Sequence, residues 1–468
     1  MDYRSCRSQL NGYLGKRAAR EFNPRDEAYT TLLSRVSSDV SMASSRGCPH
    51  TCRDAALAHF SFYEEYRKSR NAQLPSDFFS MKFGLDLPPQ QRVYAGFFVY
   101  SFCMGSLPPR LPDLQRMMRI KEGLLGFGLI GAAAGTLVSL GFFGPILERI
   151  GYRRSILTLI PLLALLYATA SFAGGPLAFF LLLFPVGIVI GGIEIILNLE
   201  ADRTEHMMGH RIMNRAHAFW SFGFFSAGII SALVAQSGLS PQIHLLLMVP
   251  LVIVGVALIL GRFDPAPHRT GTSDEKPPHV AMPTMAIMAL VAVTLSAMIM
   301  EGAGIDWSAI YMRDVFAVPP FLSGFAVALG AGAQAVTRFF ADPFVERYSP
   351  TAVSRVLLRV LGVGVLLVFF APSDWLALVG FALMGVGTSV IFPLAMSAAA
   401  QLTDRPAPTN VASLAQISFV GFLLGPPLLG NVAEHFGIRW SFGVGLPLVI
   451  LSMVCARALG TKPLKHEV

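Results

Sequence analysis

The chain has 468 residues, of which 53% are hydrophobic and only 14% are charged, and its mean hydropathy is +0.55. A soluble domain of this length carries far more charge, so the composition excludes that class and predicts an integral membrane protein. The formal net charge is +8. No basic motif interleaved with aromatic residues accompanies this charge, so we expect no nucleic-acid partner.

Residues 1–90 are predicted to form a polar N-terminal extension. They contain no apolar run of membrane length and lack the basic start, apolar middle and small-residue cleavage site of a signal peptide. Either a disordered tail or a start site assigned too early accounts for them, with Met81 as a later start. Cys48 and Cys52 flank His50, but the second ligand pair of a zinc site is missing. We therefore predict no metal and no cofactor.

Apolar runs occupy most of the chain after residue 90, and most of them are long enough for the roughly 20 helical residues that cross the hydrocarbon of a membrane. The first set is Val93–Leu107, Gly123–Leu147, Ile156–Phe172, Leu177–Leu197, Ala216–Ala235 and Ile243–Leu260. The second set is Met285–Met300, Phe321–Phe340, Val353–Phe370, Trp375–Ala400, Val411–Leu429 and Phe442–Leu459. This pattern predicts an all-α membrane protein of twelve transmembrane helices. Its parts are an N-terminal half at 91–260, a cytoplasmic linker at 261–282, a C-terminal half at 283–460 and a cytoplasmic tail at 461–468.

A short charged segment separates the second and third runs. It carries two glycines, which allow a tight turn, and four charged residues: Gly144, Glu148, Arg149, Gly151, Arg153 and Arg154. The pair Glu346–Arg347 repeats Glu148–Arg149 at an offset of 346 − 148 = 198. The same offset carries Pro145 onto Pro343 and Gly187 onto Gly385. A register shared over this distance predicts two repeated six-helix halves, as in transporters built from parallel repeats.

Basic residues predict the orientation of the chain. With the N-terminus inside, the inward loops hold far more Arg and Lys than the outward loops, and this assignment counts Arg338 among the inward loop residues. Both termini are therefore expected on the cytoplasmic side. The segment from Glu200 to Arg215 is expected to be a charged loop between the fourth and fifth helices.

The spacing of the charged segment resembles the signature loop of the major facilitator superfamily, with Glu148 where the family usually has Asp. Three further motifs resemble its YbjJ-like bacterial branch. They are Gly191 to Glu194 followed by Asn198, His217 to Trp220 before a Ser-x-Gly run, and Glu301 to Ser308, which contains Asp306 and Trp307. The resemblance covers most of residues 90–460 and implies a twelve-helix secondary transporter.

Glu194 is the candidate proton carrier. It lies inside the fourth apolar run, where an ionisable group is costly and is a functional candidate by default. Asn198 is four residues further along and so shares its helix face, and His217 begins the next helix. Adding 198 to Glu194 gives Phe392, so the acid is peculiar to the first half. The alternative is a structural Glu194 that bonds to Asn198 or His217 and fastens two helices.

Two further groups of residues are candidates for gating. Glu301 is expected in the outer third of the seventh helix, where Glu301, Asp306 and Trp307 form either an outer gate and solute contact or a helix-end cap with Trp307 anchored at the membrane interface. Residues of the signature loop are expected to hold the cytoplasmic side shut, with Glu346 and Arg347 as their second-half counterparts.

The chain contains no P-loop, no Gly-x-Ser-x-Gly and no His-Glu-x-x-His, so we expect neither an enzyme nor an ATP-driven pump. The prediction is a proton-coupled secondary transporter that moves a small solute by alternating access, as a monomer in the bacterial cytoplasmic (inner) membrane. Its expected partners are the solute, protons and the lipid bilayer. The alternatives are a multidrug or metabolite exporter of the same fold and a non-transporting membrane sensor.

The predicted topology can be tested with single cysteines on a background that lacks the native ones. A cysteine at Gly271 in the linker should react only from the cytoplasmic side, and one at Ser237 only from the outside. Labelling by a membrane-impermeant maleimide in intact cells and in inverted vesicles measures this. Reaction of both positions in intact cells would contradict the topology with the N-terminus inside.

Overall fold

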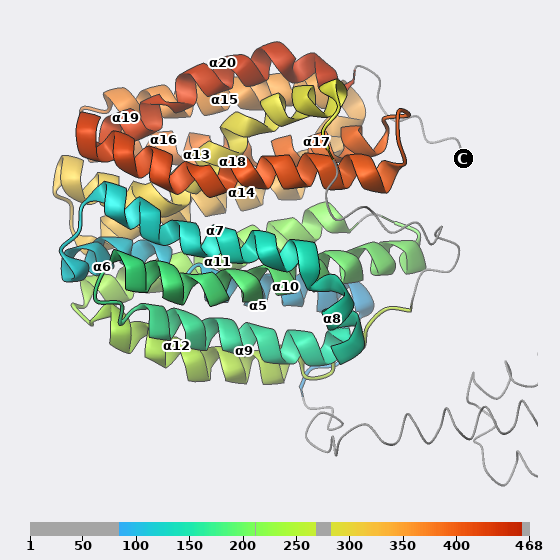
Figure 1. Cartoon of the computed structure of the whole chain (residues 1–468), viewed down its shortest axis with the longest axis horizontal. Helices are drawn as coiled ribbons and strands as arrows, with labels where there is room; N and C mark the ends of the chain where they lie inside the picture. Colours follow the sequence, from blue (N-terminus) through green and yellow to red (C-terminus); the bar gives the residue numbers. More distant parts are fainter. Residues whose placement is uncertain (1–83, 211, 268–281, 461–468) are drawn as a thin grey trace, which may run out of the picture. The chain divides into compact units, whose positions relative to one another are not determined.

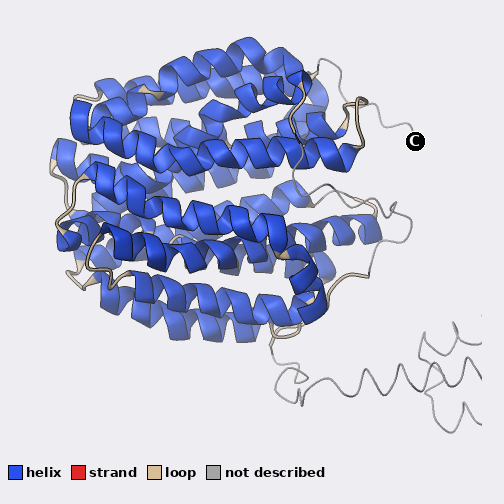
Figure 2. Ribbon diagram, in the orientation of Figure 1, coloured by secondary structure: helices blue, strands red, loops and turns tan. Residues whose placement is uncertain are grey.

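The computed structural model describes residues 84–210, 212–267 and 282–460, which belong to one compact unit. The extension up to residue 83, most of the linker and the tail after residue 460 lie outside the described residues, and so do the cysteines at 48 and 52. All regular structure in the described part is helical, and Figure 2 shows only helices and loops there.

Six membrane spans make up the first half. They are α5 (Pro89–Met104), α7 (Glu122–Phe142), α9 (Tyr152–Ala170), α10 (Pro176–Met208), α11 (Met213–Gln236), and α12 (Pro241–Gly255) with the π-helical turn η2 (Val256–Leu260). Shorter helices connect them: η1 (Pro108–Arg110) and α6 (Leu111–Met118) before α7, and α8 (Gly144–Ile150) after it.

The second half repeats the plan. Its spans are α13 (Met285–Phe316), α14 (Pro320–Tyr348), α15 (Pro350–Phe370), α16 (Asp374–Thr388) with α17 (Ile391–Ala400), α18 (Ala407–Phe436), and α19 (Ile438–Gly443) with α20 (Gly445–Cys455) and η3 (Ala456–Leu459). Eleven of the twelve spans are long and apolar enough to cross a membrane by length and composition, and α5, with 16 residues, falls short. The predicted twelve-helix fold is confirmed.

Local sequence explains where many of these helices begin. Proline occupies the first position of several spans, where its missing N–H costs nothing and its fixed φ suits the helix; these are α5, α10, α12, α14 and α15. The signature segment is helical rather than a loop. Gly151, with φ +88, separates this short helix from α9. Ser349, with φ +93, separates α14 from α15 in the same way.

The repeat is visible in the packing as well as in the sequence. A Cβ on Gly187 would lie 1.9 Å from the carbonyl oxygen of Ala132, and one on Gly385 would lie 2.1 Å from that of Gly330. Gly385 and Gly330 lie 198 residues after Gly187 and Ala132. In each half, therefore, the second and fourth spans (α7 with α10, α14 with α16) cross with their backbones touching, which only glycine permits.

The two halves meet along two pairs of helices, α7 against α18 and α11 against α14. Figure 1 shows these spans running side by side. We call the end of the bundle that carries α8 and Gly151 the signature end, and the end that carries η1 and α6 the distal end. In Figure 1 the signature end lies to the right and the distal end to the left.

The charged segment after Leu199 is not the expected loop. Helix α10 continues to Met208, and both Glu200 and Arg203 are buried, 3.7 Å apart at Oε1 and Nη1. Most of the predicted loop is therefore helical, because α10 ends at Met208 and α11 begins at Met213. Because Glu200 and Arg203 pair with each other inside the protein, the helix can continue past the apolar run. Hydropathy alone therefore predicted the end of this helix too early.

The close crossing of α7 and α10 predicts a stability difference between two glycines of one helix. Ala at Gly135 would bring its Cβ to 2.0 Å from the carbonyl oxygen of Phe184, whereas Gly141 has nothing within 4 Å of its added Cβ. Overpacking costs about 1–3 kcal/mol, so Gly135→Ala should lower the midpoint of thermal unfolding in detergent. Gly141→Ala is the control and should leave it unchanged or slightly raised; equal midpoints would contradict this packing.

Candidate functional site

Glu194 lies at the centre of a hydrogen-bonded cluster in the first half. Tyr100 of α5 donates to its Oε1 at 3.0 Å, and Asn198 donates to its Oε2 at 3.0 Å. His217 of α11 approaches the other side of Asn198, with Nε2 3.3 Å from Oδ1. The structure therefore brings the three predicted residues together on α10 and α11, and adds Tyr100, which fixes the carboxylate against α5.

Arg338 is a buried residue of α14 and not the cytoplasmic loop residue expected from its charge. Its residue surface is only 9% exposed. Its Nη1 donates to Ser221 Oγ at 2.9 Å, and its Nε donates to the carbonyl oxygen of Ser389 at 2.8 Å. Since Ser221 belongs to α11, the guanidinium crosses from the second half to the first.

Glu301 faces this arginine from α13. Its Oε1 lies 3.6 Å from Arg338 Nη2 and accepts a hydrogen bond from Gln334 Nε2 at 2.8 Å. Gln334 in turn accepts from Ser221 Oγ at 3.0 Å. We call Ser221, Glu301, Gln334 and Arg338 the cross-half network. It joins α11, α13 and α14 by charge-assisted and neutral hydrogen bonds.

The expected positions of Glu301 and Trp307 were wrong. Helix α13 does not end near Met300 but runs unbroken to Phe316, so Glu301 is the seventeenth of its 32 residues and lies near its middle. Trp307 is fully buried, which excludes the role of an interfacial anchor. Its ring fits against Gly430 of α18, where an added Cβ would lie 3.0 Å from Cη2.

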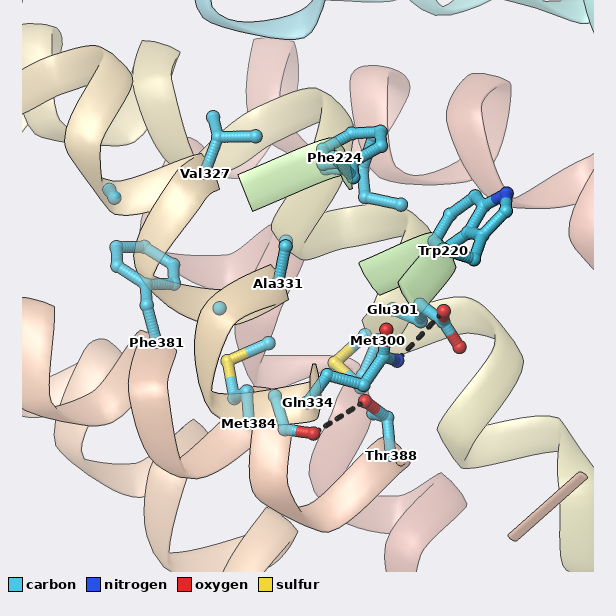
Figure 3. A pocket seen from close by; sticks show the side chains of 15 residues that line it. Trp220, Phe224, Met300, Glu301, Val327, Ala331, Gln334, Phe381, Met384 and Thr388 are labelled. Atoms are coloured by element: carbon cyan, nitrogen blue, oxygen red, sulfur yellow. Dashed lines mark hydrogen bonds between the residues drawn. The ribbon is translucent and has the colours of Figure 1, made fainter. Parts of the chain in front are cut away.

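A cavity lies beside the cross-half network (Figure 3). Its volume is about 420 Å³, which includes the space at its opening. Helices α11, α13, α14 and α16 line it. Its wall is mostly apolar and aromatic, with Trp220, Phe224, Met300, Phe381 and Met384, and its polar groups come from Glu301, Gln334 and Thr388.

Carboxylates outnumber the cation at this centre. The charge of Arg338 acts on both Glu194 and Glu301, so one guanidinium serves two acids. Asp306, one to two turns further along α13, is half-buried and makes no hydrogen bond or ion pair among the described residues. Its charge acts on Tyr167 of α9, a residue of the first half. A centre with excess carboxylate requires a proton or another cation to balance it.

Polar contacts also join the two halves at the distal end. Glu434 of α18 accepts a hydrogen bond from the backbone N–H of Gly123 at 3.2 Å and lies 3.5 Å from Lys121 Nζ. A carboxylate at the N-terminus of α7 is favoured by the helix dipole. Arg313 of α13 donates to Gln115 Oε1 of α6 at 2.7 Å. These contacts link the two halves at the distal end.

The signature residues occupy the opposite end of the bundle. Gly144 begins α8, and Arg149, Glu346 and Arg347 are exposed. Arg153 Nη2 donates to the carbonyl oxygen of Gly261 at 2.5 Å, which ties the start of α9 to the end of η2. Arg154 is the third residue of the same helix. These contacts lie within one half, and a gating role for the signature residues stays a prediction.

Sequence reasoning missed Arg338 and Gln334, although a signal was present. Both lie inside the predicted run Phe321–Phe340, and a charged residue within such a run is a functional candidate. Subtracting 198 from 338 gives Leu140, so the arginine is peculiar to the second half as Glu194 is to the first. Arg338 was missed because it was counted as a loop residue when the basic residues were used to predict the orientation of the chain.

Comparison with known families gives a match over most of the described chain. The family model described as Major Facilitator Superfamily matches residues 93–358 and 289–467. An uncharacterized transporter, y4wD, of Sinorhizobium fredii is 27% identical over 362 residues, which cover 76% of this chain and 94% of the relative. An uncharacterized MFS-type transporter of Yersinia pestis is 26% identical and covers 78% and 94% of the two chains.

Solved structures with the same fold include the nucleoside transporter NupG and the human organic anion transporter MFSD10. The NupG structure aligns with a TM-score of 0.61 at 14% identity, over 80% of this chain and 98% of that one. The MFSD10 structure aligns with a TM-score of 0.57 at 16% identity, over 79% and 100%. At these identities the likeness concerns the fold.

The cross-half network predicts a specific pattern of stabilities. Arg338→Ala leaves Glu301 without its cation and should lower the free energy of unfolding in mixed micelles by about 3 kcal/mol. The double variant Glu301→Gln, Arg338→Ala removes both charges and should recover part of that loss. Arg359→Ala, an exposed arginine of α15, is the control. If the losses of the two single variants simply add, the two side chains do not interact.

Proposed function

Because the chain belongs to the major facilitator superfamily, whose members are multi-pass membrane transporters of small solutes, we propose that it is a proton-coupled secondary active transporter that works by alternating access. The observation that supports this most is the cross-half network beside a central cavity. Arg338 and Gln334 both bond to Ser221 of the opposite half, and these bonds must be lost or exchanged when the halves rock.

The distal contacts suggest which state of the cycle the structure represents. Glu434 of α18 bonds to the N-terminus of α7, and Arg313 of α13 bonds to α6, so both contacts oppose opening of the distal end. If the signature end is cytoplasmic, this conformer is closed to the outside. Opening the distal end would break these charge-assisted contacts, each worth about 1.5–3 kcal/mol. Contacts of that size can separate two states by the few kcal/mol that a ligand or a proton is able to shift.

Glu194 is the proposed site of the transported proton. Its carboxylate is held by Tyr100 and Asn198, both of which can donate to it, and it lies within the field of Arg338. Loss or gain of a proton there changes how many charges Arg338 must balance. This links the protonation of the first half to the strength of the Arg338–Glu301 pair of the second half.

The signature residues have a proposed role in the alternate state. In the closed state of the cytoplasmic side, Glu148, Arg149 and Arg153 would contact the opposite half, as would Glu346 and Arg347 from their side. Charge pairs near helix ends contribute about 0.3–1 kcal/mol each. The proposed location is the bacterial cytoplasmic (inner) membrane, with both termini on the cytoplasmic side.

Transport can be tested with a mixture of solutes in place of a single chosen one. Liposomes that contain the purified protein are loaded with a soluble metabolite extract from bacteria, and mass spectrometry follows which compounds leave when a pH gradient is imposed. We expect specific compounds to leave from liposomes with the parent protein and not from empty ones. Release of no compound in either direction of the gradient would contradict the proposal.

The proton role predicts a separation of two signals in the same liposomes. With the dye pyranine inside, the parent should show a pH change that accompanies release of the transported compound. Glu194→Gln should abolish this pH change while exchange of the compound across the membrane survives. Asp86→Asn, at an exposed position before α5, is the control. An unchanged pyranine signal in Glu194→Gln would assign Glu194 a structural role only.

A further inference from the structure

The cavity carries one kind of charge only. Glu301 is the single charged residue of its lining, which contains no Lys, Arg or His among the described residues. The nearby Arg338 does not supply a free cation, because its donors are directed to Ser389, Ser221 and Glu301. An anionic solute would therefore face a carboxylate and aromatic rings without a counter-charge.

Glu301 has acceptor capacity to spare. Its Oε1 takes the hydrogen bond from Gln334 and faces Arg338, and its Oε2 has no partner in the described part of the chain. The side chain of Glu301 is 22% exposed, whereas that of Arg338 is 10% exposed. Figure 3 shows the carboxylate beside Trp220 at one side of the cavity, with the Gln334 amide reaching to it.

The rest of the wall suits an apolar body with a positive end. Trp220 and Phe224 stack with their centroids 5.5 Å apart, and Phe381 stands on the other side of the cavity. Aromatic faces attract a cation, and the thioethers of Met300 and Met384 are polarisable and adaptable. The wall therefore favours an ammonium group near Glu301 and a compact hydrocarbon or aryl group beyond it.

We propose that the cavity binds a small amphiphilic organic cation, with its ammonium group on Glu301 and its apolar part against Trp220, Phe224 and Phe381. This inference rests on the proposed transport function and specifies its substrate class. An organic cation and a proton both neutralise the same excess of carboxylate at Glu194, Glu301 and Asp306. Entry of the cation therefore favours release of the proton, which makes the exchange of one for the other the expected mode of coupling.

Binding is measured on the full-length purified protein with three probe cations: phenethylammonium, benzyltrimethylammonium and hexylammonium. The matched probes without positive charge are phenylacetate and 2-phenylethanol. At least one of the cations should raise the thermal midpoint and bind by calorimetry, and neither matched probe should do so. Binding of none of the three cations, or of phenylacetate as tightly as phenethylammonium, would overturn the proposal.

Two pairs of variants locate the site. Glu301→Gln should weaken binding of the cation about tenfold or more, because it removes the one charge of the lining, and Asp86→Asn, at an exposed position before α5, should not change it. Trp220→Ala should weaken binding likewise, whereas Trp375→Ala, an exposed tryptophan of α16, should leave it unchanged. Equal affinities for Glu301→Gln and the parent would place the cation elsewhere and contradict the proposal.

The substrate class and the transport function fail in different experiments. If liposomes release a compound under a pH gradient but that compound is neutral or anionic, the transport function stands and the cation proposal is wrong. If a cation binds but nothing is exchanged by the liposomes, the site stands as a binding site and the transport function is wrong.

Discussion

The burial of Arg338 is the constraint on which the described architecture of the centre depends. A guanidinium inside a membrane protein is tolerated only when its donors are satisfied and its charge is balanced. Two of its donors bond to Ser389 of the second half and to Ser221 of the first half, and the carboxylate of Glu301 balances its charge. The three partners come from three different segments, so this one side chain requires α11, α13, α14 and the end of α16 to meet.

The close helix crossings provide the rigid bodies between which this network acts. In each half, the second and fourth spans touch backbone to backbone, at Gly187 in the first and Gly385 in the second. Contacts of that kind leave little freedom within a half. The two halves are also packed closely, since a Cβ on Gly126 of α7 would lie 2.4 Å from the carbonyl oxygen of Pro426 of α18. Rocking must therefore separate these packed faces as well as break the distal contacts and the cross-half network.

The fold could be predicted from the sequence because hydropathy, glycine spacing and the offset of 198 all reflect constraints that act along the chain. The spans and the repeat follow from them, and even the junction at Ser349, which keeps the left-handed backbone of Gly151, lies in register. Helix ends were less predictable. Helices α10 and α13 continue beyond their apolar runs, because protein contacts and not lipid surround Glu200, Arg203 and Trp307.

The site could be predicted only in part, and for a physical reason. Glu194, Asn198 and His217 are linked by helical spacing and by consecutive helices, so their proximity is a local property of the sequence. The partnership of Arg338 with Ser221 joins residues 117 positions apart, and no local pattern encodes it. The basic residue that is most informative about function was also the one that simple charge counting treats as a marker of topology.

Rocking of the two halves about the cross-half network, with opening of the distal contacts, can be measured directly. Pulsed electron paramagnetic resonance reports it with spin labels on exposed residues of opposite halves, Met117 with Phe436 at the distal end and Ile146 with Tyr348 at the signature end. Between about pH 8 and about pH 5, a range in which buried carboxyl groups titrate, we expect one distance to lengthen while the other shortens. Distances that stay constant, or that lengthen together, would contradict the rocking motion.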